Sequence, residues 1–355
     1  MNAAELWIQL SADGLVEGAQ PDPEPSGSPW FVRVMLGIAG WIGALFLLIF
    51  VGLTLSSIID DAASSLIAGA ACCAGAFALF RGFDGQDFAE QFALALGLTG
   101  QALLVVGLAH LFKAGNAGLY LAVAAAEATL VLVIPHFLHR LLATGGAALA
   151  VALAFNQLAF QGLAAPLLCV ALAAIWLNPA RWATSGRLWR PIGYGLVLAL
   201  LLTETFRLFG TENLFGRARE TGWMALHVPL VGRGLTGAVL IWVAAVLSIR
   251  EGFAPNSRIV LLAVGAASLM AILCMMAPGL GSALLIVLLG FAAGNRLLIA
   301  FGILSLLGFA GHFYYSLHAT LLAKSGILAV TGFGLLAASL FLRRSADRLE
   351  QPRNA

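Results

Sequence analysis

The chain has 355 residues, of which 61% are hydrophobic and only 10% are charged, with a mean hydropathy of +0.96. A soluble globular domain is about 45–50% apolar and about 25% charged, so this composition excludes a water-soluble globule. The net charge of +2 also excludes the strong basic field that attracts nucleic acid.

Residues 1–29 differ in composition from the rest of the chain. Ala4 to Val16 predicts one short helix, and the proline-rich run from Pro21 to Pro29 predicts a stiff, solvated linker. The segment lacks the positive start and the long apolar core of a signal peptide. We therefore expect an uncleaved helix and linker on the cytoplasmic side.

Apolar runs of about 20 residues, each long enough to cross a hydrocarbon core of roughly 30 Å, fill most of the remaining sequence. The sequence therefore predicts an all-α polytopic transmembrane helix bundle at 30–344 and a cytoplasmic tail at 345–355. We expect about twelve spans, at 34–57, 62–80, 92–112, 117–135, 141–159, 162–178, 191–209, 234–249, 258–276, 279–294, 297–315 and 319–342.

The distribution of basic residues predicts the orientation. With twelve spans and the N-terminus inside, 13 of the 19 basic residues fall on the cytoplasmic side and five on the other side. Because cytoplasmic loops are enriched in Lys and Arg, we expect both termini in the cytoplasm. The connection at 210–233 is the main exception, and we expect it to lie on the outer membrane surface and to contact a partner protein.

Four ionisable residues inside predicted spans are the best candidates for a function, because a charge at the bilayer centre costs about 2.5–3.5 kcal/mol on insertion scales. Glu127 lies midway along the fourth span, Glu204 and Arg207 are three apart on the seventh, and Lys324 lies in the last. One interpretation is structural: Glu204 pairs with Arg207, and Lys324 pairs with Glu127 or, as the substitute, Glu204. The other makes these residues a proton- or cation-coupling site or the lining of a solute path.

Cofactor and enzyme motifs are absent from the sequence. The four cysteines lie in apolar runs, where they behave as small hydrophobes, so no disulfide or metal knuckle is expected. His136 and His139 have the spacing to share a metal, but an interfacial cap explains them better. No metalloprotease, nucleophile-elbow, phosphate-loop or dinucleotide motif is present. We therefore expect neither a cofactor nor an enzyme.

The segment from Gly311 to Ser325, GHFYYSLHATLLAKS, resembles the terminal motif of a family of bacterial multi-pass inner-membrane proteins, domain of unknown function 4401. The motif residues are Phe313, Tyr314, Tyr315, Thr320, Lys324 and Ser325. The leading segments LWIQLSADGL and PWFVR are similar to the start of that family. The resemblance implies a bacterial inner-membrane location and a complex with a smaller membrane-anchored partner. It implies no reaction, and the wider relatives are uncharacterised.

Two functions remain open. The first is a permease-like protein whose path includes Glu127, Glu204 and Lys324, although the sequence shows no convincing half-to-half repeat. The second is a non-transporting scaffold or regulatory subunit that binds a partner through the 210–233 connection and the N-terminal helix. A polar midplane cavity at Glu127 or Lys324 favours the first function, and a closed apolar bundle favours the second.

Overall fold

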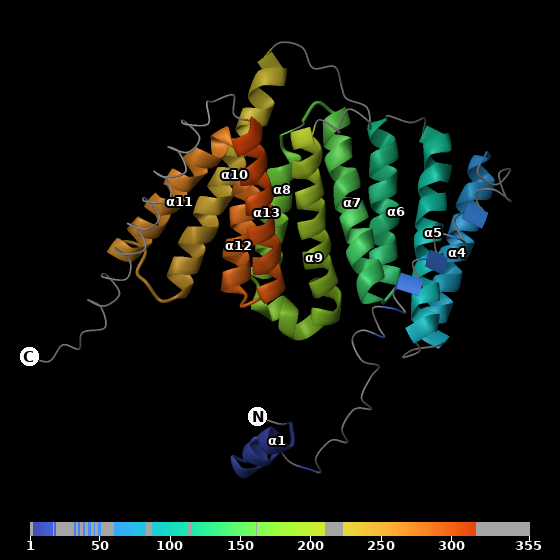
Figure 1. Cartoon of the computed structure of the whole chain (residues 1–355), viewed down its shortest axis with the longest axis horizontal. Helices are drawn as coiled ribbons and strands as arrows, with labels where there is room; N and C mark the ends of the chain where they lie inside the picture. Colours follow the sequence, from blue (N-terminus) through green and yellow to red (C-terminus); the bar gives the residue numbers. More distant parts are fainter. Residues whose placement is uncertain are drawn as a thin grey trace, which may run out of the picture. The chain divides into compact units, whose positions relative to one another are not determined.

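The computed structural model describes residues 3–16, 18, 32, 35, 38–39, 42–43, 46, 49–50, 60–82, 87–112, 116–160, 162–209 and 223–316. Within these residues every regular element is an α-helix (Figure 1), which confirms the all-α prediction. The chain divides into two compact units, Met1–Leu103 and Leu104–Ala355, and each is described by itself. Thr320, Lys324, Ser325 and the connection at 210–222 lie outside the described residues.

The first unit contains α1 (Ala3–Ala12), α4 (Ala62–Gly82) and most of α5 (Asp87–Phe112). The Asp61 carboxylate caps α4 by accepting hydrogen bonds of 2.9 Å from both the backbone N and the Oγ of Ser64. Helices α4 and α5 approach closely at Gly100, where a Cβ would lie 2.6 Å from Cys73 Sγ and 2.8 Å from the Gly69 carbonyl. Small residues permit such an approach, which is how helices pack in a bilayer.

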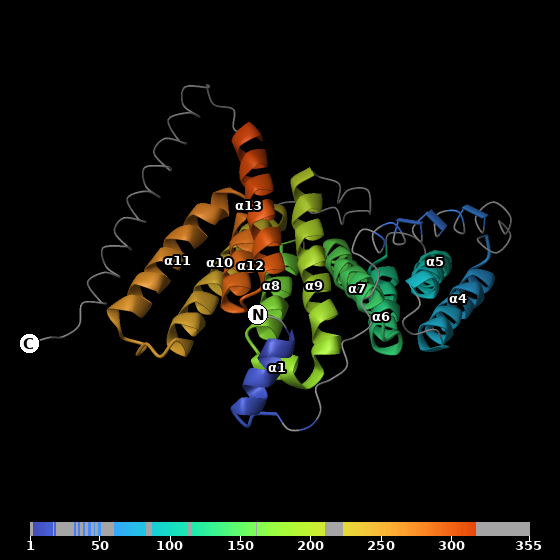
Figure 2. The same cartoon turned by 60° about the horizontal axis from the view of Figure 1, so that its bottom comes forward.

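The described part of the second unit contains eight whole helices, whose arrangement can be followed in Figures 1 and 2. Helix α7 packs against α6 and α9, α10 packs against α8, α11 and α12, and α12 also contacts α8, α9 and α13. The helices are α6 (Ala117–Val133), α7 (Phe137–Gln157), α8 (Ala164–Trp176), α9 (Pro179–Phe209), α10 (Trp223–Arg250), α11 (Arg258–Met276), α12 (Leu280–Ala292) and α13 (Arg296–Ser316).

Seven helices in the described residues are long and apolar enough to cross a membrane. Three more apolar helices are shorter: α6 has 17 residues, and α8 and α12 have 13 each. Thirteen residues rise about 20 Å, which is less than the roughly 30 Å of a hydrocarbon core. The chain is thus a membrane protein by helix length and composition, and the expected count of twelve spans remains a prediction.

The two short helices form the centre of the second unit. Leu172 of α8 and Leu285 and Ile286 of α12 are completely buried, together with Leu200 of α9 and Val243 of α10. Helix α12 is packed on nearly every side, whereas α8 leaves one face exposed at Leu167 and Val170. A short helix inside a bundle does not need the length of a lipid-facing span.

A local repeat underlies this centre, although no half-to-half repeat was recognised in the sequence. Helix α8 is preceded by Gly162-Leu163 and followed by Asn178. Around α12 the corresponding residues are Gly279-Leu280 and Asn295, and Leu280 is already the first residue of that helix. Each short helix therefore turns at an asparagine into the next long helix, α9 or α13. The similarity is confined to these hairpins, which is why a search for equal halves misses it.

The two ends of the second unit differ in charge. One end, which we call the arginine-rich end, contains the turns at 177–178 and 251–257, joined by a hydrogen bond from Arg250 Nη1 to the Leu177 carbonyl. The opposite end, the Glu204 end, contains the turns at 158–163 and 277–279. The arginine-rich end carries the described residues Arg140, Arg187, Arg190, Arg250, Arg258 and Arg296, and the Glu204 end carries Arg207 and Arg233.

Candidate functional site

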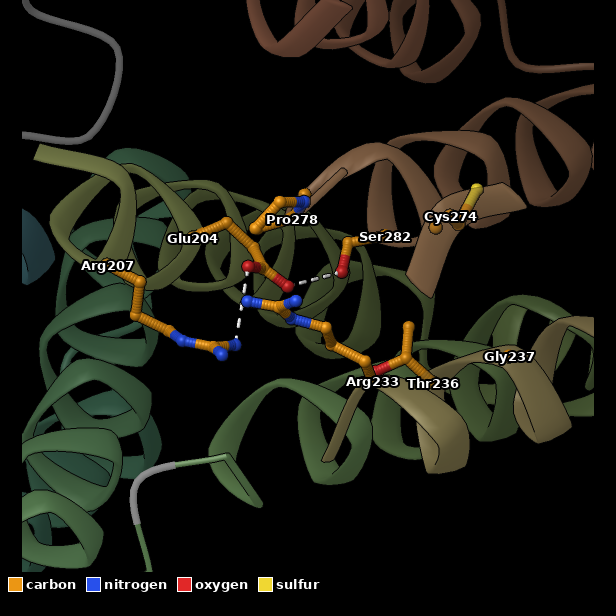
Figure 3. A pocket seen from close by; sticks show the side chains of 10 residues that line it. Glu204, Arg207, Arg233, Thr236, Gly237, Cys274, Pro278 and Ser282 are labelled. Atoms are coloured by element: carbon orange, nitrogen blue, oxygen red, sulfur yellow. Dashed lines mark hydrogen bonds and ion pairs between the residues drawn. The ribbon is translucent and has the colours of Figure 1, made fainter. Parts of the chain in front are cut away.

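A cluster of charged and polar side chains lies at the Glu204 end, where α9, α10 and α12 meet (Figure 3). Helix α9 supplies Glu204 and Arg207 one turn apart, and α10 supplies Arg233 and Thr236. Ser282 comes from the first turn of α12. We call these five residues the α9–α10–α12 cluster.

The carboxylate of Glu204 is the centre of the cluster. Its Oε1 accepts a hydrogen bond of 2.7 Å from Ser282 Oγ, and its Oε2 lies 3.5 Å from Arg207 Nη1. Glu204 is 3% exposed and Ser282 1% exposed, so both polar groups are removed from solvent. The Glu204–Arg207 ion pair expected from the three-residue spacing is therefore present, with a third partner from α12.

Arg233 adds a second guanidinium to the cluster. Figure 3 shows its side chain extending from α10 toward the Glu204 carboxylate. Its Nη1 donates a hydrogen bond of 3.0 Å to the Met275 carbonyl, while its buried Nε has no hydrogen-bond partner within the described residues. Two guanidinium groups therefore face one carboxylate in this part of the structure.

A small cavity separates these groups. Its volume is about 20 Å³, and its wall includes the side chains of the cluster together with Cys274 and Pro278. A water molecule needs roughly 10–15 Å³ measured in this way, so the cavity has room for one. The cluster therefore combines charge, burial and space for one water molecule.

The turn before α12 shapes this cavity. Gly279 has φ +86°, a left-handed conformation that favours glycine, and a Cβ there would lie 2.8 Å from the Phe309 ring of α13. The turn brings the first turn of α12 next to the cavity, where Gly281 and Ser282 form part of the wall. The partial positive charge at the start of a helix faces the cavity from this side.

Further weak contacts connect the cluster to neighbouring helices. Cys169 Sγ of α8 lies 3.9 Å from Ser282 Oγ, at the length of a sulfur hydrogen bond. Thr236 Oγ1 donates to the Gly232 carbonyl at 3.1 Å, and the backbone of Gly232 is in close contact with that of Gly162. Cys169 was expected only as a small hydrophobe, and its role as a partner of Ser282 depends on the contact between α8 and α12.

Glu127 lies apart from the cluster, on α6. It is 7% exposed, and its carboxyl packs against Gly146 of α7, where a Cβ would lie 3.5 Å from Glu127 Cδ. The Oε2 atom is buried and has no hydrogen-bond partner among the described residues. The expected partner, Lys324, lies outside those residues, so the Lys324–Glu127 interaction stays a prediction.

The aromatic part of the terminal motif forms the end of α13. Tyr314 and Tyr315 have ring centroids 5.5 Å apart, and Tyr315 is 82% exposed, while the Phe313 carbonyl accepts a hydrogen bond from Ser316. One turn earlier, His312 packs edge-on against Phe209, with 5.3 Å between centroids. The motif thus begins beside the C-terminal end of α9, the helix that carries Glu204.

The histidine pair at the start of α7 acts as a cap. His136 is the N-cap residue, and its Nδ1 accepts a hydrogen bond from the backbone N of His139 at 3.5 Å. No group of three or more His, Cys, Asp or Glu side chains with metal-binding geometry occurs in the part of the chain that the structure describes. The capping interpretation of the pair is therefore confirmed.

Sequence reasoning missed Arg233, Thr236 and Ser282. The signals that point to them are a charged residue more than two turns inside the apolar α10 and a serine three residues after the helix-breaking Pro278-Gly279. Neither signal indicates a partner, because the three residues meet only through the packing of α9, α10 and α12.

A family model described as Domain of unknown function (DUF4401) matches residues 29–345. Neither a curated protein nor a solved structure matches the chain.

Proposed function

The chain belongs to the DUF4401 family, and from its buried charged cluster we propose that its second unit is a permease-like carrier of a small polar solute. The α9–α10–α12 cluster is the proposed solute site. The observation that carries the proposal is the meeting of Glu204, Arg207 and Arg233 around a cavity inside a bundle of apolar helices. Charged residues in membrane spans are costly and usually mark a solute or ion pathway.

A purely structural role would need fewer charges. Glu204 and Arg207 alone form an ion pair within one helix. Arg233 comes from a different helix, and its Nε has no hydrogen-bond partner among the described residues. The guanidinium of Arg233 is half-buried and bonds the Met275 carbonyl through Nη1, but its Nε is left available to a ligand in the cavity.

The short helices support the same proposal. In many transporters, discontinuous helices direct their positive N-terminal ends at anionic groups of the solute. The N-terminal turn of α12 borders the cavity, and α8 and α12 form the repeated hairpins at the centre of the unit. With two guanidiniums against one carboxylate in the described wall, we infer a solute that carries a carboxylate or phosphate group.

The proposal is tested with the full-length protein in liposomes on a solid-supported membrane. Concentration jumps of succinate, glutamate and inorganic phosphate are applied, and the transient current is recorded. We expect a current with at least one solute, a loss of at least tenfold in Arg233→Gln, and an unchanged current in Arg258→Gln, an exposed arginine outside the cluster. Equal currents from the wild type and Arg233→Gln with every solute would contradict a solute site at Arg233.

A scaffold or regulatory subunit is the second candidate. The close apolar packing beneath the cluster favours it, because Leu172, Leu200 and Leu285 are completely buried there. In this case, affinity purification of the tagged chain recovers a membrane-anchored partner. Deletion of 212–226 should remove that partner, while Arg233→Gln should retain it.

A further inference from the structure

A second and much larger cavity lies at the arginine-rich end of the second unit. Its volume is about 880 Å³, within the range of small-molecule sites. Residues from the ends of α8, α9, α10, α12 and α13 form its wall. The cavity is therefore at the opposite end of the helix bundle from the α9–α10–α12 cluster. It is not part of the proposed solute site.

The charged residues in its wall are mainly cationic. Arg190, Arg250 and Arg296 line the cavity, with Glu251 as the only carboxylate in that wall. Arg250 donates to the Leu177 carbonyl, while Arg190 and Arg296 make no hydrogen bond or ion pair to any described residue. Planar guanidinium groups without partners match the oxygens of a phosphate group.

Aromatic and amide side chains give the cavity a fixed shape. The rings of Trp176 and Trp182 lie 4.7 Å apart, and Tyr194 packs against Trp176 at 5.5 Å. Trp176 is only 7% exposed because it packs against Gly193 of α9. Asn295 Nδ2 donates to Tyr194 Oη at 2.6 Å, which connects the start of α13 to α9.

An apolar groove continues from this cavity. The groove is lined by α7, α9 and α13, has a volume of about 230 Å³, and shares Phe137, Tyr194 and Leu297 with the cavity. Along α9 it runs from Tyr194 to Leu201, about 10 Å at 1.5 Å per residue. In Figures 1 and 2, α9 lies between α7 and α13, and all three are candidate membrane spans.

We propose that the cavity and groove together bind one anionic phospholipid. The phosphodiester lies among Arg190, Arg250 and Arg296, and an acyl chain occupies the groove between α7, α9 and α13. Basic pockets between transmembrane helices on the cytoplasmic side are suited to anionic headgroups, and the excess of arginine at this end favours the cytoplasmic leaflet. A soluble phosphate compound matches the arginines equally well but would leave the apolar groove empty.

The test uses the purified full-length protein in detergent micelles, titrated with phosphatidylglycerol, phosphatidylcholine or inorganic phosphate. The rise of the thermal unfolding midpoint gives the half-saturating concentration of each probe. We expect saturable stabilisation by phosphatidylglycerol only. A basic residue near an anionic lipid surface contributes an effect equivalent to about fivefold in binding. Arg296→Gln and Arg190→Gln should therefore each raise the half-saturating concentration about fivefold.

Matched controls separate the headgroup, the groove and general surface charge. Arg258→Gln removes an arginine from the same end but outside the cavity wall and should have no effect. Leu201→Phe narrows the groove and should weaken the phosphatidylglycerol effect, whereas Leu304→Phe on the exposed side of α13 should not. The thermal unfolding midpoint without lipid shows whether each variant is folded. If Arg296→Gln is not folded, Arg190→Gln takes its place in the test.

Three results would overturn the proposal. Equal stabilisation by phosphatidylcholine and phosphatidylglycerol would show that the headgroup charge is not recognised. Stabilisation by inorganic phosphate that is lost in Arg296→Gln and retained in Leu201→Phe would identify a soluble phosphate ligand instead. An equal loss of phosphatidylglycerol stabilisation in Arg258→Gln and Arg296→Gln would show that the stabilisation reflects general surface charge. None of these results depends on the proposed solute site, which lies at the other end of the bundle.

Discussion

Ser282 donates a hydrogen bond of 2.7 Å to Glu204, although the two residues are 78 positions apart in the sequence. The bond joins the first turn of the short α12 to the last two turns of α9. Both residues are nearly inaccessible to solvent, so neither can exchange this partner for water without local opening. The bond therefore couples the position of α12 to that of α9.

Ser282→Ala should lower the free energy of unfolding by about 1–3 kcal/mol, because it leaves a buried carboxylate oxygen without its donor. The measurement is a denaturant titration in mixed micelles. Ser268→Ala is the control: Ser268 Oγ donates to the Val264 carbonyl within its own helix, so its loss should cost less than about 0.5 kcal/mol. Equal costs for the two variants would show that the Ser282–Glu204 bond does not stabilise the fold.

Arg207→Gln and Glu204→Gln should each destabilise the protein, since the first leaves Glu204 with Arg233 alone and the second leaves Arg207 and Arg233 without the Glu204 carboxylate. The double variant should cost less than the sum of the two, with a coupling energy of about 0.5–3 kcal/mol. A double-mutant cycle of unfolding free energies measures this coupling. Strict additivity would mean that Arg207 is solvated independently of Glu204.

Part of this site was accessible from the sequence, and part was not. Glu204 and Arg207 are neighbours on one helical face, so their spacing predicts the ion pair that the structure contains. Arg233 and Ser282 reach the same place because α12 contacts both α9 and α10, and no local pattern encodes such contacts. The same limit applies to Cys169, whose sulfur contacts Ser282 across helices.

The fold shows a similar division. Apolar runs predict helices, and nearly all described helices fall where such runs were recognised. Hydropathy does not distinguish a lipid-facing span from a short helix buried in a bundle, because both are apolar on most sides. The segments 162–178 and 279–294 were therefore expected as full spans, whereas α8 and α12 have 13 residues each.

Gly279→Ala should destabilise the second unit by at least about 2 kcal/mol. A left-handed conformation costs a non-glycine residue roughly 1–2 kcal/mol, and the added Cβ would also lie 2.8 Å from the Phe309 ring. Gly308→Ala is the matched control, because Gly308 lies inside α13 with no neighbouring atom within 4 Å of an added Cβ. That variant should be neutral or slightly stabilising, since alanine favours a helix over glycine. Thermal midpoints in detergent compare the two, and a neutral Gly279→Ala would contradict the role of this turn.

The last prediction concerns Glu127, whose buried Oε2 has no hydrogen-bond partner in the described part of the chain. An isolated carboxylate is costly in a membrane span, so we expect Glu127 either to carry a proton or to pair with Lys324. If they pair, Lys324→Met alone should lower the folded yield, and Lys324→Met with Glu127→Gln should restore it, because a pair removed together costs less than one charge removed singly. Size-exclusion chromatography of detergent extracts measures the yield. If Glu127 carries a proton without a partner, Glu127→Gln alone should leave the yield unchanged, since glutamine has nearly the same shape, and Lys324→Met should then act independently of it. Strictly additive losses from the two substitutions would therefore exclude the Lys324–Glu127 pair.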